Sequence, residues 1–205
     1  MKHPVRGFKN LQIGLKELEP FIRNGEHLQT GTPFKTLSGM LSREVLANWL
    51  ICVAYNFECQ ADRLTFTSDP LGGDGIIRDN ATEETFPTEH VMVARARIGK
   101  ADDAGALILK AVEHKRNKGG AAYASGKTLV VFLNGSGGVW FPNAVTKQLP
   151  EPLYFAAVWV VGTHGMDEGR YVYSVSSLEL VEGNAPTWLV RIGVDFNAWE
   201  VIPVQ

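Results

Sequence analysis

The sequence predicts one α/β domain, with a mixed central sheet flanked by helices and extra strands at the C-terminal end. Two observations lead to this class. Between residues 40 and 135 the apolar patterns follow the order helix, strand, strand, strand, helix, strand. The run KTLVVFLNG (127–135) is continuously apolar, as expected for a central parallel strand that is covered on both faces. No repeat, low-complexity stretch or linker composition divides the 205 residues, so we expect a single domain.

We divide this domain into a core at about 40–135, an N-terminal helical extension at 1–35 and a C-terminal β-rich extension at 150–205. In the N-terminal part, leucines recur at helical spacing over 8–23, but Pro20 interrupts them, which predicts a kinked or two-piece helix. The segment NGEHLQTGTP that follows is predicted to be a loop from its glycine, asparagine and proline content.

The core begins with SREVLANWLICVAYNFE (42–58), whose apolar spacing predicts a helix. RLTFTSDP (63–70) alternates and is rich in threonine and phenylalanine, so we expect a strand. GIIRD and FPTEHVMVAR are two further strands, and the turn DNATEE between them predicts a hairpin. ADDAGALILKAVEHKRNKG (101–119) is predicted to be a helix that Asp103 caps.

After residue 138 we expect a short helix in PNAVTKQLP and then the C-terminal strands, in the runs LYFAAVWVVGT, RYVYSVSSLELV, TWLVRI and WEVIPV.

Bulk composition excludes several classes of protein. The net charge is −2 and the pI is about 6.2, so a nucleic-acid site would have to rest on a local basic patch. Cys52 and Cys59 have no metal-binding spacing and are expected to be buried free thiols. The N-terminus lacks an apolar signal region, and no run approaches the roughly 18 apolar residues of a membrane span. We therefore expect a cytoplasmic protein that does not bind membranes.

Two acidic residues stand at unusual places in the predicted hairpin. Asp74 introduces the first strand in LGGDG, and Glu89 lies inside the second. Alternation puts Glu89 on the same face as Val91 and Val93, where a carboxylate is costly unless a cation or hydrogen bonds compensate it. Two structural alternatives remain: Asp74 is a turn residue in an Asp-Gly pair, and Glu89 is solvated because its face points outward.

The element order and these two acids resemble the PD-(D/E)xK nuclease superfamily, whose core has the restriction-endonuclease-like fold. The resemblance covers roughly residues 40–135 and implies that Asp74 and Glu89 bind Mg²⁺ or Mn²⁺. The family's lysine is replaced by Val91, and Lys115 on the next helix is the closest candidate to supply that role. Glu44 stands where many relatives carry a third acid facing the metal; the alternative is an ordinary exposed helix charge.

A rival alignment takes Glu113-His114-Lys115 as the acid-x-lysine motif itself. It requires residues 106–112 to be a strand, and it leaves little room for the crossover helix before the next parallel strand. We rank it second.

The resemblance implies a metal-dependent nuclease that hydrolyses phosphodiester bonds, in DNA rather than RNA. A homodimer is open, since restriction-type enzymes often dimerise. His90 would support the metal ligands or carry protons; the alternative is a surface histidine or a core histidine with satisfied hydrogen bonds. The basic residues that would contact the phosphate backbone are Lys115, Arg116, Lys118 and Lys127, and the alternative for them is a solvated helix end.

Two other functions stay open. One is a catalytically inactive module of the same fold that binds nucleic acid or protein, which the missing lysine at position 91 favours. The other is a small-molecule hydrolase with its site near His164 and Asp167, in GTHGMDEG (162–169), a segment that we otherwise expect to be a polar turn.

Overall fold

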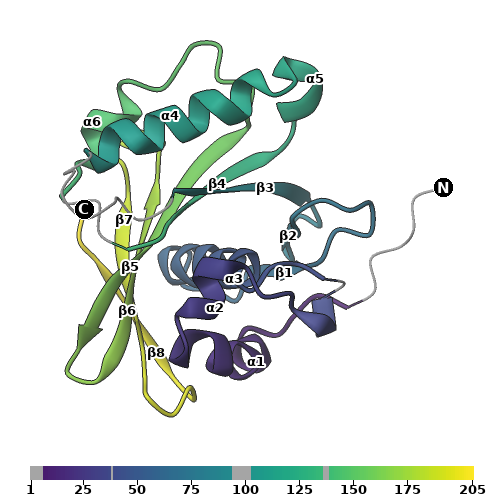
Figure 1. Ribbon diagram of the computed structural model, residues 1–205, viewed down its shortest axis with the longest axis vertical. Coiled ribbons are helices and arrows are strands. Elements are labelled where there is room, and N and C mark those ends of the chain that lie inside the picture. The colour runs from purple at the N-terminus through teal and green to yellow at the C-terminus, as the bar shows by residue number, and fades with distance from the viewer. Residues whose placement is uncertain (1–6, 38, 94–102, 136–138) are drawn as a thin grey trace.

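The computed structural model describes residues 7–37, 39–93, 103–135 and 139–205. Figure 1 shows how their elements are arranged. A short 3-10 turn, η1 (Lys35–Leu37), precedes α3. The helices are α1 (Leu11–Arg23), α2 (Glu26–Thr30), α3 (Ser42–Glu58), α4 (Ala104–Asn117), α5 (Gly120–Ala124) and α6 (Pro142–Thr146). The strands are β1 (Leu64–Thr67), β2 (Ile76–Asp79), β3 (Thr85–Val93), β4 (Thr128–Leu133), β5 (Ala157–Asp167), β6 (Arg170–Ser177), β7 (Thr187–Ile192) and β8 (Trp199–Pro203).

In the described residues the strands form one eight-stranded mixed sheet, and their order in space, β1 to β8, is their order in the sequence. β3, β4 and β5 are parallel to one another, and every other neighbouring pair is antiparallel. A parallel pair needs a connection that returns the chain to the same end of the sheet. α4 and α5 lie in the first return and α6 in the second. The predicted mixed sheet, the β2–β3 hairpin and the central strand β4 are thereby confirmed.

α3 is buried on nearly all sides because it lies between the sheet and helices α1 and α2 (Figure 1). Trp49, fully buried at its centre, donates a hydrogen bond from its indole nitrogen to the Leu11 carbonyl at 2.8 Å. The ring of Trp199 from β8 meets Trp49 edge-on with centroids 5.3 Å apart. Residues far apart in the sequence thus fix α3 between helix α1 and strand β8.

A second apolar cluster covers the opposite face of the sheet. Ile108 and Val112 of α4 are fully buried and pack with Leu129 and Val131 of β4. Asp103 caps α4 as predicted, since its side chain accepts the Gly105 amide at 2.9 Å. The two clusters place α3 and α4 on opposite sides of β3 (Figure 1), so a group on either helix can approach that strand from its own side.

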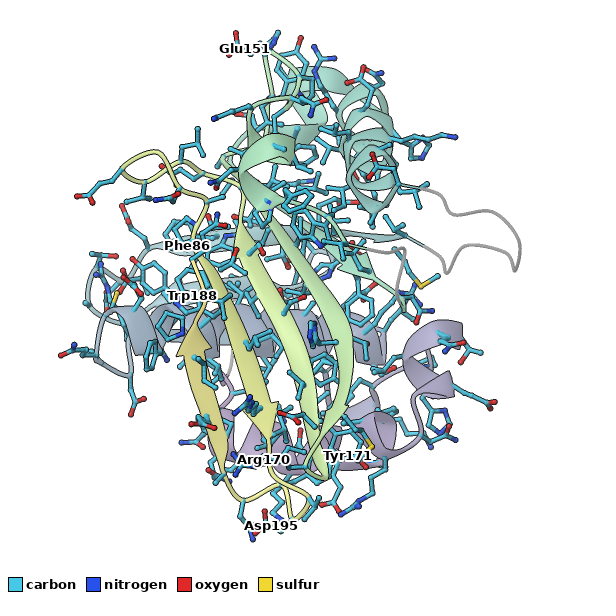
Figure 2. The ribbon with its side chains drawn as sticks, turned by 90° about the vertical axis from the view of Figure 1, so that its left-hand side faces the viewer. Phe86, Glu151, Arg170, Tyr171, Trp188 and Asp195 are labelled. Carbon is cyan, nitrogen blue, oxygen red and sulfur yellow. The ribbon has the colours of Figure 1, made fainter. Side chains whose placement is uncertain are left out.

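The C-terminal strands extend the same sheet. Figure 2 places Arg170 and Tyr171 near Asp195 at one end of these strands, with Glu151 at the opposite end of the molecule. The indole rings of Trp159 and Trp188 stack at 6.0 Å between centroids. The C-terminal extension therefore shares one sheet with the core.

Some elements differ from the sequence prediction. α1 is one helix that contains Pro20. The predicted loop at 24–33 contains α2, and α5 is an additional short helix. Five-residue helices show too little periodicity to be recognised from sequence. β5 continues to Asp167, so most of the predicted turn GTHGMDEG is strand. Cys52 is buried as expected, whereas Cys59 is only partly buried.

Among the described residues, no helix has the length and apolar character needed to cross a membrane.

Candidate active site at the open edge of strand β3

Asp74 lies where β3 loses its strand neighbour on the β2 side. β2 begins only after Gly75, so beyond that point the amides of β3 need other acceptors. The Thr88 amide donates to the Gly75 carbonyl at 2.8 Å, and the His90 amide donates to the Asp74 carboxylate at 2.7 Å. The side chain of Asp74 thus takes the place of a strand partner. This contact fixes the carboxylate beside β3.

The side chains of β3 alternate as the sequence predicts. His90 points towards α3, where its Nε2 lies 3.2 Å from Asn48 Oδ1. Glu89 points towards α4, where its carboxylate meets Lys115. Val91 joins the apolar cluster under α4, on the same side as Glu89. Glu89 therefore lies on a largely buried face, which excludes the solvated alternative.

Two lysines and a tyrosine compensate the buried carboxylate of Glu89. Lys115 Nζ is 2.5 Å from Glu89 Oε1, and Lys127 Nζ is 4.0 Å from Oε2. The Tyr123 hydroxyl donates a further hydrogen bond to Glu89. Burial raises the pKa of Glu89, but the bonds from Lys115 and Tyr123 outweigh it and hold the pKa below its ordinary value. Glu89 is thus ionised at neutral pH.

Lys115 reaches Glu89 from the helix that follows β3, although Val91 occupies the motif position on the strand itself. The sequence prediction that the next helix supplies a lysine is consistent with this contact. The rival alignment on Glu113 is wrong, because residues 106–112 form part of α4 and not a strand.

Tyr123 is a site residue that the sequence analysis did not identify. It comes from α5, and its ring lies beneath two ammonium groups, with Lys127 Nζ at 4.3 Å and Lys118 Nζ at 4.9 Å from the centroid. Burial raises the pKa of its phenol, as does the bond to Glu89, so the hydroxyl keeps its proton. One signal was present: Tyr123 is the only Phe, Trp or Tyr between Phe86 and Phe132.

Asp74 and Glu89 influence each other without direct contact. Burial raises the pKa of Asp74, the His90 amide opposes this, and the charge of Glu89 raises the pKa further. A positive group between the two carboxylates would oppose both causes that raise the pKa of Asp74, namely burial and the charge of Glu89. Lys115 already lowers the pKa of each.

Glu44 approaches the same region from the first turn of α3. It is 8% exposed, which excludes the alternative of an exposed helix charge, and its carboxylate accepts the Leu41 amide at 2.8 Å. Its pKa is raised to about 7, first by burial, which outweighs the bond from Leu41, and also by the charge of Asp74. Lys115 acts on Glu44 in the opposite direction, so all three groups are in electrostatic contact.

The structure does not bring Arg116 to Glu89. Its guanidinium donates to the Pro152 carbonyl at 2.6 Å and lies over the Tyr154 ring at 5.2 Å. It also pairs with Glu113 at 3.2 Å. Arg116 is therefore bound to residues outside the candidate site. The other three basic residues that were predicted to contact phosphate lie around Tyr123 and Glu89; they are Lys115, Lys118 and Lys127.

The donor set at this edge suits a hard cation, but it is not a preformed three-ligand cage. In the described part of the chain, no three His, Cys, Asp or Glu side chains are grouped to hold a metal ion, so Glu44 does not join Asp74 and Glu89 in one cluster. Mg²⁺ commonly uses one or two carboxylates and keeps several waters. Asp74 and Glu89 fit that smaller requirement by their chemistry.

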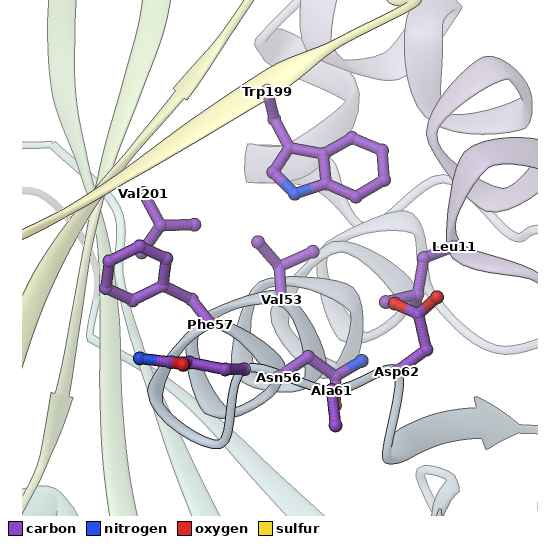
Figure 3. A pocket seen from close by; sticks show the side chains of 9 residues that line it. Leu11, Val53, Asn56, Phe57, Ala61, Asp62, Trp199 and Val201 are labelled. Carbon is purple, nitrogen blue, oxygen red and sulfur yellow. The ribbon is translucent and has the colours of Figure 1, made fainter.

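A pocket elsewhere in the molecule contains none of the predicted site residues. It has a volume of about 390 Å³ and lies between α3 and β8, where Figure 3 shows Trp199 and Val201 facing Val53 and Phe57. Asp62 stands at its rim. The pocket is therefore separate from the edge of β3.

The C-terminal alternative near His164 is not supported by a catalytic pairing. Asp167 forms an ion pair with Arg191 at 3.1 Å, at the end of β5. His164 is exposed, on the wall of a pocket of about 360 Å³ that Tyr171 and Tyr173 also line. These contacts give Asp167 a structural role.

No family model matches the chain, and no curated protein and no solved structure is significantly similar to it. The geometry at the open edge of β3 is therefore the basis on which a function can be assigned.

Proposed function

We propose that this protein is a metal-dependent nuclease with a divergent restriction-endonuclease-like core, and that it hydrolyses phosphodiester bonds in DNA. One observation carries the proposal: Lys115, from the helix between β3 and β4, lies at Glu89, while Asp74 is tied to the neighbouring residue of the same strand. The two carboxylates thus belong to adjacent positions along one open strand edge, and the lysine lies at the second of them. A lysine from α4 compensates for Val91.

Each residue has a defined task in this reaction. Asp74 and Glu89 would hold Mg²⁺ or Mn²⁺, which when bound polarises a phosphoryl oxygen and acidifies a water molecule. Lys115, an ammonium with three donors, orients the attacking water and attracts the scissile phosphate. Glu44 accepts a proton near neutral pH, since its pKa is about 7.

Binding of the phosphate backbone falls to Lys118 and Lys127, which flank Tyr123. The chain as a whole has a net charge of −2, so attraction to nucleic acid has to be local. Tyr123 holds the two ammonium groups beside Glu89, where a phosphate must lie to be cleaved. The preference for DNA over RNA comes from the family resemblance.

The test is cleavage of supercoiled plasmid with Mg²⁺ or Mn²⁺, with a single-stranded RNA as second substrate. Asp74→Asn, Glu89→Gln and Lys115→Met should each lower the rate by at least about 10²-fold, the usual loss when one group that positions or stabilises the reacting atoms is removed. Asp69→Asn is the matched control, because Asp69 lies in the same loop and its carboxylate accepts the local Leu71 amide. Cleavage that persists in the Asp74 and Glu89 variants rejects the assignment.

A second candidate is a non-catalytic binding module of the same fold. It is favoured by the pairing of Glu89 with both Lys115 and Lys127, which already neutralises that carboxylate. Metal titration separates the two functions, since a ligand bound to the native state raises its stability. A Tm that rises with Mn²⁺ in the wild type and not in Asp74→Asn supports the nuclease; an unchanged Tm supports the binding module.

A further inference from the structure

A small polar cluster is buried under Asp74, on the α3 side of the sheet. Asn48, Thr88 and His90 are 0%, 2% and 7% exposed. Polar side chains at such depth are costly unless they are hydrogen-bonded. Yet Asn48 Nδ2, Thr88 Oγ1 and His90 Nδ1 have no partner among the described residues. Because burying these unpaired polar atoms costs free energy, we expect the cluster to have a function.

The one strong contact within the cluster defines the state of His90. Its Nε2 lies 3.2 Å from Asn48 Oδ1, and an amide oxygen can only accept, so Nε2 carries the hydrogen. Nδ1, the other ring nitrogen, has no partner among the described residues, so no second contact favours hydrogen there.

His90 is also bound through its backbone. Its amide donates to the Asp74 carboxylate at 2.7 Å, while its ring is bound to Asn48 on α3. His90 thus connects helix α3 to Asp74 at the open edge of β3. Glu89, the adjacent residue, carries the second carboxylate, so a shift of His90 displaces both.

Gly75 adds an independent constraint on the same arrangement. A Cβ at this position would collide with the Asn48 amide nitrogen and lie 3.1 Å from Thr88 Oγ1. Its φ of +139° is also a conformation that residues with a side chain rarely adopt. Asn48 therefore lies directly against the backbone that follows Asp74, and LGGDG needs a glycine at its last position.

We propose that His90 is a positioning residue, held by Asn48 as the Nε2–H tautomer, which fixes the Asp74 carboxylate beside Glu89. The catalytic part of this inference rests on the proposed nuclease function. The tautomer and the bond to Asp74 are properties of the folded protein and can be tested without activity. His90 itself contacts neither the phosphate nor the metal in this arrangement.

The first test is the ring of His90 in ¹⁵N-histidine-labelled wild-type protein, observed by long-range ¹H–¹⁵N NMR. We expect hydrogen on Nε2 of His90; His90→Gln identifies the signal by its loss. A ring with hydrogen on Nδ1 and none on Nε2 overturns the proposal.

The second test is hydrogen exchange at the His90 amide. In Asn48→Leu we expect that amide to exchange at least about tenfold faster than in the wild type, because the ring no longer anchors its bond to Asp74. Amides in β4 serve as an internal control for global stability. An unchanged exchange rate at His90 shows that Asn48 does not position it, whether or not the protein cleaves DNA.

The kinetic test compares three substitutions. His90→Leu should lower kcat by about tenfold or more, because misplacing a reacting group by a fraction of an ångström is costly, with KM for DNA unchanged. His90→Gln keeps an amide donor for Asn48 and should restore most of the rate. His114→Gln, on the exposed side of α4, is the matched control. Equal rates in His90→Leu and wild type contradict the positioning role, whereas a wild type without any cleavage contradicts only the nuclease function.

Discussion

The most unusual residue of the site is Glu44, an acid buried in the first turn of a helix. Its carboxylate caps the Leu41 amide, which explains why an acid is tolerated there. Burial nevertheless disfavours its charge, so that its pKa is raised to about 7. An acid that titrates at neutral pH next to Asp74 is suited to proton transfer and makes stability depend on pH.

We expect Glu44→Gln to remove that pH dependence. A raised native pKa stabilises the fold below the unfolded value of 4.5, and this stabilisation is lost as pH rises through about 7. The glutamine variant should therefore gain about 3 kcal/mol relative to wild type between pH 4 and pH 8. Urea unfolding at both pH values measures this. A constant difference between the two proteins would show that Glu44 has an ordinary pKa.

Tyr123 allows the contributions of a hydroxyl and a ring to be separated. Tyr123→Phe loses the bond to Glu89 but keeps the ring under Lys118 and Lys127. We expect a several-fold lower kcat with DNA affinity unchanged, whereas Tyr123→Ala should weaken DNA binding as well, as expected for a cation–π contact of about 1 kcal/mol. Filter binding and plasmid cleavage distinguish the two. Equal affinity in both variants would show that the ring does not hold the lysines.

Helix α4 carries Lys115, so the signals that start and orient this helix matter for the proposed function. Asp103 was predicted as its cap, and the structure confirms the bond to Gly105. The apolar residues Ile108 and Val112 then fix which side of the helix faces the sheet. Lys115 lies on an adjacent side of α4, where its ammonium group reaches Glu89 on β3.

Removing the cap should weaken the fold while leaving the chemistry intact. We expect Asp103→Ala to lower the free energy of unfolding by about 1 kcal/mol, the typical value for a lost N-cap. Asp103→Ser retains a capping oxygen and is the control. Denaturant unfolding gives the energies, and plasmid cleavage at 25 °C should be unchanged. A rate that falls in parallel with Asp103→Ala would mean that the cap also positions Lys115.

Several features were accessible from the sequence and others were not, for physical reasons. The face that Glu89 shares with Val91 and the cap at Asp103 follow from local patterns, and both were predicted correctly. The burial of Glu44 was not, because it results from α1 and the sheet closing around α3. Tyr123 was missed because the five-residue helix α5 has no recognisable period.

Across the whole molecule the charge is nearly balanced, but its distribution is uneven. Lys115, Lys118 and Lys127 gather near one end of β3 and β4, whereas Arg170 at the far end of β6 is paired with Glu200 at 3.0 Å. The field that a polyanion meets therefore depends on where it approaches. Attraction should be confined to the edge of β3.

We expect this asymmetry to appear in the salt dependence of DNA binding. Lys118→Gln should reduce the slope of log affinity against log salt by about one, the change for one lost phosphate contact. Arg170→Gln, at the opposite end of the sheet, should leave the slope unchanged. Fluorescence anisotropy with labelled duplex over a salt series gives both values. Equal slopes in the two variants would show that DNA does not bind at the surface around Lys118.

The strands lie in space in the same order as in the sequence. During synthesis each new strand can therefore add to the edge left by its predecessor, without threading past finished structure. The proposed site residues, from Glu44 to Lys127, all precede the last four strands. We expect the ribosome-bound chain to assemble the edge of β3 first and to cover α3 only when the C-terminal strands arrive, with the stacking of Trp159 on Trp188 as the optical signal of that last step.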